Sequence, residues 1–175
     1  MNEAFLVSIL AVTIRAGTSL LYATIGEIFT ERCGILNLGV EGIMIMGAAM
    51  GFAAAYHSES VWIGVVAAMM AGGLLALIHA FLTISLQADQ VVSGLVLTLF
   101  GTGMANFLGQ KLGPGGAPLV GLIGPKFLRA PIPILSDLPF VGGSIFSQDL
   151  LVYLIYVVVP VAWFFLYRTR PGLHL

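Results

Sequence analysis

The chain has 175 residues, of which 59% are hydrophobic and only 9% are charged, and its formal net charge is −1. Soluble domains carry about 25% charged residues, so this composition excludes an ordinary water-soluble domain. The lack of a basic patch argues against a nucleic-acid partner. The single cysteine rules out an internal disulfide, and the sequence predicts neither a metal site nor a cofactor.

Five apolar stretches are candidate membrane spans, because one crossing needs about 20 predominantly apolar residues. Together they predict an all-α, polytopic transmembrane helical bundle of about five spans. In chain order the stretches run from Phe5 to Phe29, from Leu36 to Tyr56, from Val61 to Leu86, from Val91 to about Leu108 and from Leu150 to Tyr167.

The second stretch contains the strongest sign of a polar path. Its purely apolar part, from Ile43 to Tyr56, is about 14 residues long and is too short to cross alone. The span therefore needs the preceding residues, which include Asn37 and Glu41 beside glycines. Polar groups in hydrocarbon are costly unless they face protein, water or a solute. We expect a discontinuous helix near residues 34–42, with Asn37, Gly39, Glu41 and Gly42 on a solute path.

A second interpretation of these residues is structural and compatible with the first. Asn37 can cap the second helix, and Glu41 can favour its positive N-terminal end. Asp89, Gln90 and Ser93 at the start of the fourth span have the same two interpretations. Either Asp89 or Ser93 caps that helix, or Gln90 and Ser93 lie near the inner end of the path.

Other polar and small residues in the spans have mainly structural interpretations. Asn106 and Gln110 lie one turn apart on one helix face, where they can meet a polar ligand or simply bind interfacial water. His79 is expected to be a hydrogen-bonded packing residue rather than a ligand. Gly47 and Gly51 form a G-x-x-x-G pair, and Gly101 and Gly103 lie in a similar small-residue face. Both predict helix-packing surfaces. No motif for a catalytic nucleophile or a phosphate-binding loop is present, so no catalytic residue is expected.

Residues 110–149 are rich in glycine and proline, which makes a regular spanning helix unlikely to form there. We expect an extracytoplasmic loop with a short surface helix near Gly121 to Leu128. Arg168 and Arg170 follow the last span and place the C-terminus in the cytoplasm, although Lys111, Lys126 and Arg129 in the loop oppose this orientation.

Two passages resemble a known family. G-E-I-F-T-E-R-C-G-I-L-N-L-G-V-E-G, from Gly26 to Gly42, and Q-A-D-Q-V-V-S-G, from Gln87 to Gly94, are similar to recurring passages in the permease subunits of ABC importers for nucleosides and simple sugars. The C-terminal Y-R-T-R-P-G-L-H-L resembles the lead-in to the cytoplasmic coupling segment, so Arg170, Pro171 and Gly172 are expected near that segment.

The resemblance covers essentially residues 1–175 and implies one transmembrane permease domain, of which this chain is the N-terminal part. Family members are about twice as long, so a truncated gene or a fragment is expected. The implied partners are two ATP-binding cassette subunits, a second permease subunit, an extracytoplasmic solute-binding lipoprotein and a small solute, in a bacterial cytoplasmic membrane. ATP hydrolysis is expected in the separate ATP-binding subunits.

Three alternatives remain open at this point. A self-sufficient ion-coupled transporter or channel can use Glu41, Asp89 or His79, but such proteins often contain internal repeats and none is visible here. A membrane-embedded enzyme needs a cluster of ionisable groups, whereas the acids here lie on different segments. A truncated, non-functional permease is the third alternative.

Overall fold

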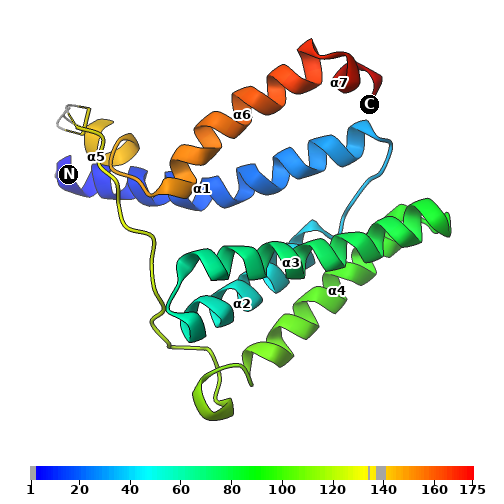
Figure 1. Cartoon of the computed structure of the whole chain (residues 1–175), viewed down its shortest axis with the longest axis horizontal. Coiled ribbons are helices and arrows are strands. Elements are labelled where there is room, and N and C mark those ends of the chain that lie inside the picture. Colours follow the sequence, from blue (N-terminus) through cyan, green and yellow to red (C-terminus); the bar gives the residue numbers. More distant parts are fainter. Residues whose placement is uncertain (1–2, 134, 137–140) are drawn as a thin grey trace. The chain divides into compact units, whose positions relative to one another are not determined.

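The computed structural model of the chain describes residues 3–133, 135–136 and 141–175. The helices in these ranges are α1 (Glu3–Arg32), α2 (Val40–Ser58), α3 (Val61–Ala80), a π-helical turn η1 (Phe81–Ser85), α4 (Gln90–Gly109), a 3₁₀ turn η2 (Pro114–Gly116), α5 (Val141–Ile145), α6 (Leu150–Arg168) and α7 (Arg170–His174) (Figure 1). The described residues contain no β-strand, only an isolated bridge between Arg129 and Asp149. The all-α prediction is confirmed.

Among the described residues, four helical stretches are long and apolar enough to cross a membrane: Phe5–Arg32, Val61–Ser85, Gln90–Gly109 and Leu150–Arg168. They correspond to the first, third, fourth and fifth predicted spans. The second predicted span corresponds to α2, which does not reach the same hydropathy alone, as expected from its short apolar part. About five spans therefore agrees with the helices observed.

The distribution of side chains is that of helices surrounded by hydrocarbon. Large apolar side chains face outward; Leu99 is 75% exposed and Met69 is 70% exposed. Many buried positions on α2, α3 and α4 hold glycine or alanine. In lipid, helices associate through close van der Waals packing of small residues, because lipid tails are as apolar as leucine.

The chain forms two compact units, one of residues Thr30–Lys126 and one of residues Met1–Phe29 with Phe127–Leu175. In the Thr30–Lys126 unit, α2 packs against both α3 and α4 (Figure 1). Helices α2 and α3 are antiparallel and approach at Gly51 and Gly64. A Cβ atom on Gly64 would lie 2.8 Å from the Gly51 carbonyl oxygen, so only glycine fits this crossing without movement.

Helices α2 and α4 run in the same direction and meet backbone to backbone. A Cβ atom on Gly42 would lie 2.6 Å from Thr98 Cα, and one on Gly101 would lie 2.6 Å from the Gly42 carbonyl oxygen. The packing role predicted for Gly47, Gly51 and Gly101 is confirmed, since each lies close to a neighbouring helix. The same prediction is wrong for Gly103, which has no atom within 4 Å of its Cβ position in the described chain.

The last residues of the third predicted span do not form a regular α-helix. α3 ends at Ala80, and the chain continues as the π-helical turn η1 to Ser85. The predicted third span ended one residue later, at Leu86. Thr83 is buried and donates a hydrogen bond from its hydroxyl to the His79 carbonyl oxygen at 2.8 Å. This side-chain bond to a nearby carbonyl accompanies the widened turn at the point where the helix ends.

The long loop folds onto the ends of α2 and α4. His57 Nε2 lies 2.6 Å from the Leu112 carbonyl oxygen, and the Leu119 amide donates to the Gly109 carbonyl at 2.7 Å. The surface helix predicted near Gly121 to Leu128 is wrong, because this stretch has no regular structure. Gly121 has φ +84 and Pro125 disfavours helical geometry before it. The extracytoplasmic position of residues 110–149 stays a prediction.

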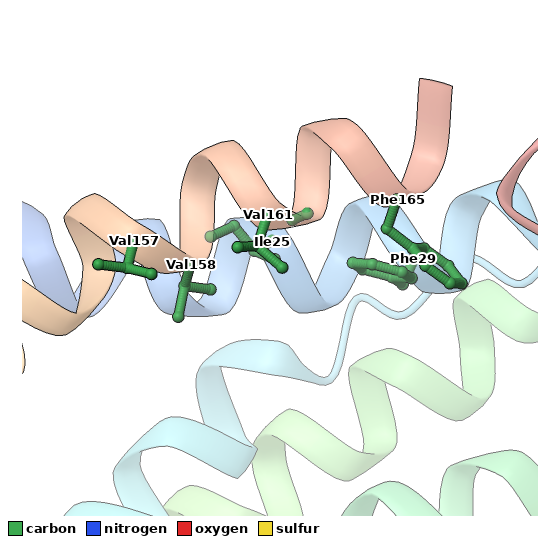
Figure 2. A pocket seen from close by; sticks show the side chains of 7 residues that line it. Ile25, Phe29, Val157, Val158, Val161 and Phe165 are labelled. Carbon is green, nitrogen blue, oxygen red and sulfur yellow. The ribbon is translucent and has the colours of Figure 1, made fainter. Parts of the chain in front are cut away.

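In the other unit, α1 and α6 lie side by side and run in the same direction. The Tyr22 hydroxyl donates to the Leu151 carbonyl at 2.8 Å, and the rings of Phe29 and Phe165 have centroids 5.8 Å apart. The two helices border a groove of about 490 Å³. Figure 2 shows that its lining side chains are all aliphatic or aromatic, so the groove suits hydrocarbon or another helix and not a polar solute.

A pair of alanine substitutions tests the backbone contact between α2 and α4. Gly42→Ala places a methyl group against Thr98 and is expected to lower the free energy of unfolding by about 1–3 kcal/mol, the usual cost of overpacking. Thermal unfolding of the detergent-solubilised protein measures the effect. Gly103→Ala is the matched control: it fills open space and is expected to be neutral or slightly stabilising. Equal stability of the two variants would contradict the observed crossing.

Candidate functional site

Residues 33–39 form a non-helical segment between α1 and α2. Helix α1 ends in a tight turn in which the Gly34 amide donates to the Glu31 carbonyl at 2.9 Å and the Ile35 amide donates to the Thr30 carbonyl at 3.0 Å. Gly34 has φ +81, a left-handed conformation that glycine adopts without strain. The sequence C-G-I-L-N-L-G thus stops one helix and extends the chain before the next begins at Val40.

Side chains of α4 bind the backbone of this segment. The Gln90 carboxamide donates to the Gly34 carbonyl at 3.2 Å and accepts from the Leu36 amide at 2.7 Å. Two turns further along α4, the Thr98 hydroxyl donates to the Leu38 carbonyl at 2.9 Å. These side chains provide the hydrogen bonds that a helix or a sheet would otherwise supply.

His79 on α3 contacts the same segment from another side. The side chain is 3% exposed. Its Nε2 lies 3.3 Å from the Leu36 carbonyl oxygen and its Nδ1 lies 3.1 Å from the Ser93 hydroxyl oxygen. A neutral ring protonated on Nε2 donates to Leu36 and accepts from Ser93, which satisfies both ring nitrogens. The expectation that His79 is a hydrogen-bonded packing residue is confirmed, and Ser93 is its partner.

Asn37 shapes the turn into α2 without capping the helix. Its buried Oδ1 accepts from the Gly39 amide at 2.9 Å. The N-cap position belongs to Gly39, and no side chain caps the helix there. The capping hypothesis for Asn37 is therefore wrong: a bond to the amide two residues ahead forms an Asx turn, not an N-cap. Glu41 lies exposed in the first turn of α2.

The non-helical segment runs along α4 for a considerable distance. Gln90 binds its start and Thr98 binds its end, and these residues are about 12 Å apart along a helix axis. Between them, a Cβ atom on Gly94 would lie 2.8 Å from the Leu38 amide nitrogen. The break predicted near residues 34–42 is thus located at residues 33–39, whereas Gly42 lies in regular helix. In hydrocarbon, such a backbone must be satisfied within the protein or line a polar cavity.

Asp89 caps α4. Its Oδ1 accepts from the Val92 amide at 2.8 Å, and the side chain is exposed at the helix N-terminus. This confirms the structural interpretation of Asp89. Of the predicted path residues, the structure therefore brings Asn37, Gly39, Gln90 and Ser93 together around the non-helical segment.

Asn106 lies at the opposite end of α4, apart from that network. Asn106 and Gln110 are both exposed and occupy one face, as predicted from their spacing. They border a cleft of about 370 Å³ between the ends of α2 and α4, partly closed by Leu119 and Val120. We refer to this as the carboxamide cleft.

The C-terminal residues form a sharp turn after α6. Thr169 has an extended backbone, and its hydroxyl donates to the Phe165 carbonyl at 2.6 Å and accepts from the Gly172 amide at 3.2 Å. Any Cβ atom on Gly172 would collide with the Phe165 carbonyl oxygen. Pro171 occupies the first turn of α7, where its missing N–H is harmless. Arg170 begins this short helix.

Sequence reasoning missed Gly94 and Thr98. Their signal was present, because Gln90, Gly94, Thr98 and Gly101 recur at intervals of four, four and three residues, which places them on one face of α4. That face contacts both the non-helical segment and the start of α2.

Gln90 offers a direct test of the hydrogen bonds that hold the segment. Gln90→Met keeps the side-chain volume and removes both bonds, so it is expected to destabilise the segment locally by about 1–3 kcal/mol. Amide hydrogen exchange of residues 34–38, followed by mass spectrometry, should accelerate. Val96→Ala on the exposed face of α4 is the control and should leave this exchange unchanged. Unaltered exchange in Gln90→Met would show that the segment is held by other contacts.

The chain matches the family described as "Branched-chain amino acid transport system / permease component" over residues 8–175. It is 41% identical over 174 residues to a protein of Haloferax volcanii assigned provisionally as a glucose ABC transporter permease, covering 98% of this chain and 51% of that protein.

Two further relatives have named nucleoside substrates. A nucleoside ABC transporter permease of Lactococcus lactis is 35% identical over 165 residues, covering 90% of this chain and 51% of its own length. A guanosine ABC transporter permease of Bacillus subtilis is 33% identical over 174 residues, covering 95% and 54%. The chain spans about half the length of these curated relatives, and no solved structure matches it. The chain belongs to this family of transport-system permease components.

Proposed function

We propose that the chain is a membrane-spanning part of the permease subunit of an ABC importer and lines the translocation path for nucleosides or related simple sugars. The proposal rests on membership of the permease family, on relatives named for glucose, nucleoside and guanosine transport, and on four helices able to cross a membrane. The family is one of permeases, so the chain itself is assigned no catalytic step.

The observation that supports a path through this chain is the non-helical backbone of residues 33–39. Some of its amides and carbonyls bond to the side chains of Gln90, Thr98 and His79. Helices interrupted in this manner supply polar groups at membrane depth in many transporters. A solute on such a path has to be held weakly enough to leave.

The proposed path residues are Asn37, Gly39, Glu41, Gly42, Asp89, Gln90, Ser93 and Asn106. The proposed partners are two ATP-binding cassette subunits, which hydrolyse ATP, a second permease subunit and an extracytoplasmic solute-binding lipoprotein, in a bacterial cytoplasmic membrane. Residues 1–175 are proposed to belong to one permease domain, with 110–149 outside. The turn at Thr169 supports a coupling role for Arg170, Pro171 and Gly172, because it redirects the chain directly after α6.

Uptake into membrane vesicles tests the proposed function. The full-length protein is reconstituted with its ATP-binding subunits, second permease and solute-binding lipoprotein. We expect uptake of labelled nucleoside or glucose that requires ATP and stops when the ATP-binding subunits are omitted. Uptake driven by an ion gradient without those subunits would instead establish an ion-coupled transporter, and absence of folded protein from the membrane would indicate a non-functional product.

A matched pair of glutamate variants tests the path assignment at the start of α2. Glu41→Gln removes a negative charge from the first turn, where it interacts with the helix dipole by about 0.3–1 kcal/mol, so uptake is expected to change about two- to fivefold. Glu59→Gln, at the other end of α2, is the control and should transport normally. Membrane insertion should be intact in both, as measured by surface labelling and yield. Normal uptake by Glu41→Gln would remove Glu41 from the path.

A further inference from the structure

The carboxamide cleft is lined by small, polar and aromatic residues. Helix α2 contributes Ala48, Ala49 and Phe52, and the end of α4 contributes Ala105, Asn106, Gly109 and Gln110. Asn106 and Gln110 lie one turn apart, about 6 Å along the helix axis. At about 370 Å³, the cleft falls within the range of small-molecule sites, about 300–1,000 Å³.

The loop after α4 fixes the shape of the cleft. The Leu119 amide donates to the Gly109 carbonyl at 2.7 Å, which holds Leu119 and Val120 at the rim. Gly124 packs against Phe52, since a Cβ atom there would lie 3.0 Å from Phe52 Cε2. The Phe52 ring therefore contacts the loop as well as lining the cleft.

The chemistry of the lining selects the kind of ligand. No charged side chain lines the cleft. Within the residues that the structure describes, no side-chain hydrogen bond uses either carboxamide, so both are available to a ligand. Each carboxamide presents a donor and an acceptor side by side in one plane. The cleft thus suits an uncharged molecule with a planar edge of adjacent donors and acceptors and an apolar face.

We propose that the carboxamide cleft binds a neutral nucleoside by its base, with Asn106 and Gln110 pairing with the heterocycle edge and Phe52 contacting the ring face. Asparagine and glutamine form such paired bonds with purine edges, and aromatic rings stack on every base. A hexose has no aromatic face and meets an aromatic ring only through its C–H groups, so it uses this lining less completely. This inference rests on the proposed transport function and names its substrate class.

Site-directed cysteine labelling tests the proposal. Cys33 is the only cysteine, so Cys33→Ala gives a cysteine-free background. Val120→Cys is introduced into the full-length protein assembled with its partner subunits in vesicles, and its reaction with a hydrophilic maleimide is timed. Val120 lines the cleft and is 90% exposed, and it makes no proposed contact with the base. Inosine and glucose are the two probes. Ser58→Cys is the control, because Ser58 is exposed at the same end of α2 and does not line the cleft.

We expect inosine to slow the labelling of Val120→Cys about tenfold when its concentration is about ten times its dissociation constant. Glucose should have little effect, and Ser58→Cys should react at the same rate throughout. Adding Phe52→Leu to Val120→Cys should remove most of the protection. Protection by glucose equal to that by inosine would overturn the assignment to a base, and no protection by either would overturn the site.

ATP-driven uptake by the Cys33→Ala protein, measured in the same vesicles, separates this inference from the proposed function. Uptake without protection of Val120→Cys overturns only the cleft as a nucleoside site. Protection without ATP-driven uptake overturns only the importer function and leaves the cleft as a binding site.

Discussion

The backbone of residues 33–39 sets the main constraint on this part of the molecule. An extended chain among membrane helices has amides and carbonyls that water cannot satisfy, and each unsatisfied group would cost several kcal/mol in hydrocarbon. The side chains of Gln90, Thr98 and His79 supply the missing partners. The positions of α3 and α4 follow from this requirement, because each must present its polar side chain to a particular backbone group.

The glycines meet the same requirement by allowing the helices to approach the segment closely. Hydrogen bonds from short side chains such as Thr98 reach the segment only if α4 lies almost in contact with it. Gly94 and Gly101 permit that approach on α4, and Gly42 permits it on α2. On the other side of α2, Gly51 and Gly64 allow α3 to pack equally closely, so α3 and α4 can both reach the segment. The hydrogen bonds to the segment therefore depend on the close packing of the helices at their glycines.

Much of the helical architecture could be predicted because apolar length is a local property of the sequence. The weakness of the second span, its polar residues and its glycines correctly located the break before α2. The partners of the segment could not be predicted in the same way, since Thr98 and Leu38 are distant in sequence and their pairing depends on which face of α4 turns toward α2. Asn37 failed as a predicted cap for a similar reason: the chain turns at Gly39, two residues later than a capping residue requires. The surface helix expected near Gly121 does not form because Gly121 adopts a left-handed conformation and Pro125 disfavours helical geometry in the residue before it.

The bonds from Gln90, Thr98 and His79 reach the main chain of the non-helical segment. Leu36 and Leu38 contribute an amide and carbonyls to these bonds, and the Leu38 side chain is 42% exposed. During evolution, these two positions can exchange one apolar residue for another while the bonds are preserved. Gly34 and Asn37 specify the turns of the segment itself, and the rest of the information that specifies its shape is stored on neighbouring helices.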